Sequence, residues 1–105
     1  MKEVDNVDDF ISQWAILPAR VRYDKNLTPN AKLIYSEIAA KCNIYGYCFS
    51  HNRHFSECFG LKEDTVSNLI KTLEEAGYIR IDVDKRRPNG QRRKIWLTAK
   101  PYEFG

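Results

Sequence analysis

The chain has 105 residues, of which 43% are hydrophobic, 12% aromatic and 30% charged, a composition typical of one globular domain and unlike disordered or collagen-like sequences. No apolar run approaches the roughly 20 residues of a membrane helix, and three cysteines without a framework spacing argue against a disulfide-built secreted domain. The net charge is only +3, yet residues 1–9 hold four acidic side chains and one basic one, while residues 85–100 hold seven basic side chains and no acidic one.

Charge and apolar pattern divide the chain into three parts. Residues 1–9 predict a loose acidic leader, residues 10–100 one domain, and residues 101–105 a short tail. Without a signal-peptide core, we expect the protein to be cytoplasmic. The apolar stretch 10–17 fits a strand as well as a short helix, and the polar residues after Pro18 predict a connection.

A long helix is predicted to begin at Thr28-Pro29, because Thr is a good N-cap and Pro is favoured at the first helical position. Apolar residues then recur at spacings of three and four, which places them on one helix face. They are Ala31, Ile34, Tyr35, Ile38 and Cys42. Residues 43–46 are expected to end this helix, and residues 47–49 to form a short strand.

Two further helices are predicted on either side of a glycine. Ser50 is expected to cap the first, and Gly60 to close it as a left-handed C-terminal residue. Its apolar face would hold Phe55, Cys58 and Phe59. The second is expected over residues 63–76, with negative charge in its first turn, and Gly77 ends it. Its buried stripe would be Val66, Leu69, Ile70 and Leu73.

The pattern then changes from helical to alternating, as in a half-buried strand. The alternating apolar residues are Ile79, Ile81 and Val83. The sequence Pro88-Asn89-Gly90 predicts a turn within residues 85–93, with a return strand over residues 94–98. The basic residues would then gather around the tip of a β-hairpin, where their charge suits a phosphate backbone.

The order helix, short strand, helix, tight turn, helix and β-hairpin resembles the α+β winged helix-turn-helix fold. Small Ser56 and Gly60 four residues later match the spacing of a helix-turn-helix, in which closely crossing helices need a small residue and the turn a positive φ. The sequence LEEAGYI at residues 73–79 resembles the junction between the recognition helix and the wing.

A more specific likeness begins at VRYDKNLTPNAKLIY, residues 21–35, and continues at GYCF, residues 46–49. These segments are similar to the N-terminal domain of replication initiators from Gram-positive phages, plasmids and related mobile elements. The likeness covers residues 16–98 and implies binding at a replication origin, or support for the assembly of replication proteins there. Neither catalysis nor a cofactor is expected, because no nucleophile triad, phosphate loop or carboxylate pair can be recognised.

Two sets of side chains are predicted to contact DNA, with a merely solvated surface as the alternative for both. On the wing, guanidinium and ammonium donors suit phosphates or a minor groove. They are Lys85, Arg86, Arg87, Arg92, Arg93 and Lys94. On the third helix and the turn before it, residues near the N-terminus would reach base edges in the major groove, and Asn68 can pair with adenine. This set is Lys62, Thr65, Ser67, Asn68 and Lys71. Arg53 in the second helix is a candidate positioning contact.

The sequence also contains residues suited to two other kinds of site. Aromatic residues interleaved with basic ones can stack unpaired bases, although aromatics of a small domain are expected mostly in its core. They are Tyr45, Tyr47, Phe49 and Trp96, of which Tyr45 and Tyr47 are expected to be the most exposed. A local group of potential metal ligands matches no zinc spacing, so no metal is expected, and Cys42 and Cys58 are assigned to the apolar faces of their helices. That group is Cys42, Cys48, His51, His54 and Cys58.

Three functions remain open on the sequence alone. The favoured one is a non-enzymatic protein that binds double- or single-stranded DNA in replication and helps to recruit a helicase, primase or polymerase. A module of this size buries about 600–1,000 Å² on DNA, which favours a homodimer or a protein partner, and no membrane partner is expected. The alternatives are a transcriptional repressor of the same fold, and an adaptor whose acidic third helix docks on a replication enzyme.

Overall fold

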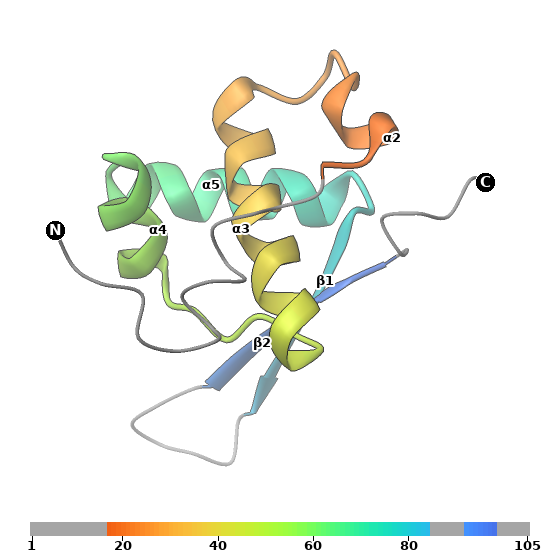
Figure 1. Cartoon of the computed structure of the whole chain (residues 1–105). Coiled ribbons are helices and arrows are strands. Elements are labelled where there is room, and N and C mark those ends of the chain that lie inside the picture. Colours follow the sequence, from red (N-terminus) through yellow and green to blue (C-terminus); the bar gives the residue numbers. More distant parts are fainter. Residues whose placement is uncertain (1–16, 85–91, 99–105) are drawn as a thin grey trace, which may run out of the picture.

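The computed structural model describes residues 17–84 and 92–98. Its elements in chain order are α2 (Ala19–Arg22), α3 (Pro29–Tyr45), α4 (Asn52–Phe59), α5 (Glu63–Glu75), β1 (Ile79–Asp84) and β2 (Arg92–Leu97) (Figure 1). Helices followed by an antiparallel hairpin confirm the predicted α+β winged helix-turn-helix. The predicted leader, the residues before Leu17, the tip of the wing and the tail lie outside the described residues.

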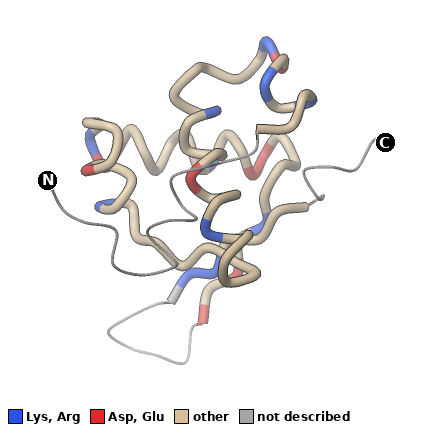
Figure 2. The backbone as a smooth tube through the Cα atoms, viewed as in Figure 1, with Lys and Arg blue, Asp and Glu red and all other residues tan. Residues whose placement is uncertain are grey.

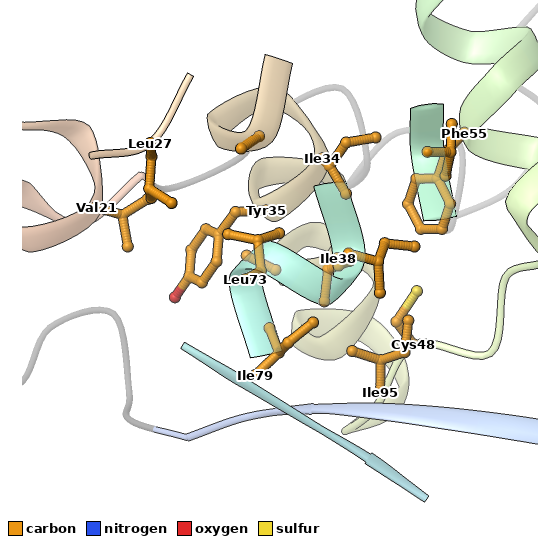
Figure 3. Close-up of a cluster of buried hydrophobic side chains, with 14 residues drawn as sticks. Val21, Leu27, Ile34, Tyr35, Ile38, Cys48, Phe55, Leu73, Ile79 and Ile95 are labelled. Atoms are coloured by element: carbon orange, nitrogen blue, oxygen red, sulfur yellow. The ribbon is translucent and has the colours of Figure 1, made fainter. Parts of the chain in front are cut away.

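The central helix α3 begins and ends where local chemistry predicts. Thr28 is its N-cap, and the hydroxyl accepts a hydrogen bond of 3.2 Å from the backbone N–H of Ala31. Pro29 occupies the first helical position, and Gly46 closes the helix with a φ of +86°. Figure 3 shows the buried cluster around α3, to which Tyr35, Phe55, Leu73 and Ile95 contribute from four different elements.

The turn between α4 and α5 is built around Ser56. The Ser56 carbonyl accepts hydrogen bonds from the backbone N–H groups of Gly60 and Leu61, and its hydroxyl donates to the Leu61 carbonyl. Gly60 has a φ of +66°, as predicted. The prediction that Ser50 caps α4 is wrong, because His51 is the N-cap and its side chain makes no capping hydrogen bond.

The hairpin pairs Ile79 with Leu97 at one end and Asp84 with Arg92 at the other. Burial decreases along β1, and Val83 is 42% exposed, because this end of the hairpin extends beyond the helices (Figure 1). Val83, which the alternating pattern places on the same face as Ile79 and Ile81, therefore does not belong to the core. The predicted strand at residues 47–49 is reduced to one antiparallel bridge, in which Cys48 exchanges two backbone hydrogen bonds of 2.8 Å with Ile95.

The predicted connection after Pro18 contains one turn of helix, α2, which is fastened to the start of the hairpin. The Tyr78 hydroxyl lies 2.6 Å from Asp24 Oδ2 and 3.1 Å from the Arg20 carbonyl. The hydrogen bond from Tyr78 holds the pKa of Asp24 below its usual value. Within residues 17–84 and 92–98, each helix is too short or too polar to span a bilayer.

Candidate nucleic-acid interface

The side of α5 opposite the core presents the polar residues that were predicted to read DNA. Lys62 is the N-cap of α5, and it is exposed together with Ser67, Asn68 and Lys71, whereas Thr65 is half-buried. Val66, Ile70 and Leu73 are buried on the opposite side, and Leu69 is partly buried against the same cluster. The helix thus exposes short polar side chains along the surface that a helix-turn-helix turns toward the major groove.

Both ends of α5 carry acidic side chains, which oppose binding of the helix to phosphate. Glu63 and Asp64 lie in the first turn and Glu74 and Glu75 in the last, and all four are exposed. Negative charge in a first turn stabilises the helix through its dipole but repels a DNA backbone nearby. Lys62 and Lys71 are therefore the positions on this helix from which phosphate contact is expected.

The hairpin stem carries both signs of charge. In Figure 2 the basic start of β2 lies beside the acidic end of β1, and the register pairs Asp84 with Arg92 and Asp82 with Lys94. Lys94 is exposed, with its Nζ 4.8 Å from the centroid of the Tyr47 ring. Three predicted wing contacts, Lys85, Arg86 and Arg87, lie outside the described residues, and so does the side chain of Arg92.

Arg93 differs from the other predicted wing contacts, because its guanidinium is bound within the protein. Its two terminal nitrogens donate hydrogen bonds of 2.8 Å to Asn52 Oδ1 and 2.7 Å to the Ser50 carbonyl. Burial lowers the pKa of Arg93 from its ordinary value. Arg93 thus joins β2 to the start of α4, and its guanidinium is less available to a phosphate than the exposed Lys94.

The inward direction of Arg93 has a signal in the sequence. Alternate residues of a strand face the same side, so Arg93 shares the side of buried Ile95 if the strand begins at residue 92. A return strand predicted to begin at residue 94 leaves Arg93 in the turn, so that prediction does not reveal that Arg93 and Ile95 share a side. An open pocket of about 360 Å³ lies beside the link, lined by His51, Asn52, Arg53, Glu63, Val83 and Arg93.

Arg53, the predicted positioning contact, lies on α4 within this pocket. Its Nε is 3.4 Å from Glu57 Oε2 one turn later, and both side chains are largely exposed. Exposed pairs of this kind contribute little free energy, so a phosphate can compete for the guanidinium at small cost. The position therefore suits a contact that orients the domain on a DNA backbone.

The structure brings Glu37 next to two members of the group of potential metal ligands in the sequence, His54 and Cys58. Glu37 on α3 joins His54 and Cys58 on α4, with one donor atom of each within 4.8 Å of the others. His54 Nε2 lies 2.7 Å from Glu37 Oε2, which is a hydrogen-bond distance, and partial desolvation raises the pKa of the Cys58 thiol. Cys58 is exposed rather than on the buried side of α4, which corrects its assignment to an apolar face. The expectation of no metal stays a prediction.

The expectation that Tyr45 and Tyr47 are the most exposed of the four candidate stacking residues is confirmed for Tyr45 and wrong for Tyr47, since Phe49 takes its place. None of the four belongs to the buried core cluster. Phe49 is 51% exposed and Tyr45 is 40% exposed, while Tyr47 and Trp96 are half-buried. Sequence periodicity could not reveal this, because the four residues come from the end of α3, the following loop and β2. Their arrangement depends on the bridge between Cys48 and Ile95.

Comparison with known proteins agrees with this geometry. The model of a family described as a helix-turn-helix domain matches residues 25–79, which include α3, the α4–α5 turn and the first residue of β1. No protein in the curated collection matches the chain. Since the family model covers more than half of the 105 residues, the chain belongs to this helix-turn-helix family.

Proposed function

We propose that this chain is a non-enzymatic DNA-binding module that acts in the replication of a phage, plasmid or other mobile element. The observation that carries DNA binding is the exposed polar side of α5, held by the turn at Ser56 and flanked by Lys62 and the hairpin. Helix-turn-helix domains place the N-terminal part of this second helix in the major groove. The module supplies binding, while helicase, primase or polymerase activity comes from a partner in the cytoplasm.

The replication role is supported by the likeness of residues 21–35 and 46–49 to replication initiators. Both segments also stabilise the fold, since Thr28 caps α3 and Cys48 forms a bridge with Ile95 of β2. A repressor of the same fold would use the same contacts to DNA. Deleting the gene should lower the copy number of the replicon that carries it, measured by quantitative PCR. An unchanged copy number together with altered transcription from a neighbouring promoter would favour the repressor.

Two variants at α5 test DNA binding, one through its affinity for all sequences and the other through its sequence preference. Lys62→Ala should weaken binding to all duplexes about equally. It should also make the slope of log affinity against log salt shallower by about 0.9, the value for one phosphate contact. Asn68→Ala should instead change the preferred sequence, because a bidentate contact to a base is worth about 1–3 kcal/mol of discrimination. Asn30→Ala, an exposed asparagine in the first turn of α3, is the matched control and should change neither. If Asn68→Ala leaves the selected sequences unchanged, α5 does not read bases.

The exposed acidic residues of α5 favour a second candidate function, docking on a basic surface of a replication enzyme. Glu74 and Glu75 lie at the end of α5 farthest from Lys62, so they can bind a protein while the other end contacts DNA. Replacing both with Gln should weaken capture of such an enzyme without changing duplex affinity. A loss of both activities together would contradict separate surfaces.

A further inference from the structure

Four aromatic side chains form a continuous row on the surface beside the wing. Tyr45 and Phe49 have ring centroids 5.2 Å apart, Phe49 and Tyr47 are 5.9 Å apart, and Tyr47 and Trp96 are 5.2 Å apart. Two cations border the row, since Lys94 lies over the Tyr47 ring and the Arg80 guanidinium carbon lies 5.5 Å from the Trp96 centroid.

The row faces away from the core because of strand alternation. Cys48 and Ile95 pair with each other and are completely buried. Their chain neighbours Tyr47, Phe49, Lys94 and Trp96 therefore point to the opposite side of the extended hairpin, as successive residues of a strand do. The bridge thus forces large apolar rings to the surface, where burial does not explain them.

A pocket of about 250 Å³ opens beside Phe49 and Tyr47, the two middle members of this row. Among the residues that the structure describes, its lining is Tyr47, Phe49, His51, Arg93 and Lys94. These supply two phenyl rings, an imidazole and two cations, and none of them is acidic. Asp82, the acid that contacts the row, accepts a 3.0 Å hydrogen bond from Trp96 Nε1 and lies 3.7 Å from Arg80, outside this lining. Aromatic faces beside positive charge suit a ligand that combines a planar ring with a phosphate.

We propose that this pocket binds one unpaired nucleotide of single-stranded DNA, with the base stacked on Phe49, the tilted Tyr47 ring at the edge of the base, and the phosphate beside Lys94. This deepens the proposed function and rests on it. A duplex cannot use the pocket, because its bases are already stacked on one another. Arg93 adds positive charge while its terminal nitrogens remain bound to Asn52 and Ser50. The domain thereby has two surfaces for DNA, α5 for the duplex and the aromatic row for a strand opened beside it.

Phe49→Ala is the direct test, because Phe49 is half exposed and its removal leaves no cavity in the core. Stacking on one aromatic side chain is worth about tenfold or more in affinity. We expect Phe49→Ala to weaken binding of a labelled thymidine oligonucleotide about tenfold in fluorescence anisotropy, with duplex affinity unchanged. Tyr23→Ala is the matched control, since Tyr23 is 71% exposed at the end of α2, outside the row, and should change neither affinity.

An abasic oligonucleotide separates stacking from attraction to phosphate. It keeps the phosphates and lacks bases, so the wild-type protein should bind it as weakly as Phe49→Ala binds the normal oligonucleotide, and Phe49→Ala should show no further loss. Equal binding of normal and abasic strands by the wild type would overturn the proposal. Duplex binding in that case would leave the proposed function intact, whereas absence of binding to any DNA would overturn both. A different outcome is that sedimentation shows a dimer of the wild type that Phe49→Ala converts to a monomer, with the affinity for single-stranded DNA unchanged. In that case the row is an interface between two copies and the proposal fails.

Discussion

Replacing Arg93 with Ala should destabilise the domain strongly, although the residue lies in a basic segment whose composition predicts contact with DNA. The substitution removes two hydrogen bonds from a charged donor. The Ser50 carbonyl and the Asn52 amide oxygen, which accept them, then lack the guanidinium as a donor. Hydrogen bonds to charged groups contribute about 1.5–3 kcal/mol each, and relief of the buried charge offsets part of the loss. We expect a net cost of about 2–4 kcal/mol. For a domain of about 100 residues this lowers Tm by about 10–30 °C.

Thermal unfolding followed by circular dichroism measures this effect directly. Arg93→Lys keeps the charge but cannot reach both acceptors with a planar fork, so it should lie between Arg93→Ala and the wild type. Lys94→Ala removes the exposed neighbour and should change Tm little. A double-mutant cycle with Asn52→Ala should give a coupling energy of about 0.5–3 kcal/mol. A Tm for Arg93→Ala within about 3 °C of the wild type would refute the structural link.

Three further outcomes test the turn and the core. Gly60→Ala should cost about 1–2 kcal/mol in urea unfolding, because the left-handed φ is strained for alanine although a Cβ there meets nothing within 4 Å; a zero cost would contradict this. Ser56→Val should cost about 1–3 kcal/mol through lost hydrogen bonding and added bulk, whereas Ser67→Val on the exposed side of α5 should not. Burial raises the pKa of the Cys42 thiol from 9.0 to about 11, so the unfolded chain releases this proton first and stability should fall from pH 9 to pH 11. Cys42→Ala should make that fall shallower, and an unchanged urea midpoint profile would be evidence against the shift.

The parts of the fold that the sequence predicts well depend on local signals. Thr28 and Pro29 begin α3, and Gly46, Gly60 and Gly77 end helices with positive φ. Each signal acts within a few residues, so no knowledge of the tertiary structure is needed to read it. The change from helical to alternating periodicity after Gly77 likewise locates β1.

The features that sequence reasoning misses depend on partners distant in the chain. Arg93 is bound by Asn52 across 41 positions, and His54 meets Glu37 across 17. The exposure of Phe49 follows from the pairing of Cys48 with Ile95, which residues 47–49 alone do not reveal. Charge counting therefore overstates the number of wing arginines available to DNA, and composition understates the aromatic surface.

The measurement that tests the central claim most directly is fluorescence anisotropy of the full chain with random duplex and random single-stranded DNA between about 50 and 200 mM salt. If three to five phosphates of duplex are contacted, log affinity should fall against log salt with a slope of about −3 to −4.5. Replacing Lys85, Arg86, Arg87 and Arg92 with Ala, with Arg93 retained to hold the fold, should flatten that slope. Salt-dependent binding with a flattened slope in this variant is the result we expect, and absence of binding to either DNA at the lower salt concentration would contradict a DNA-binding function.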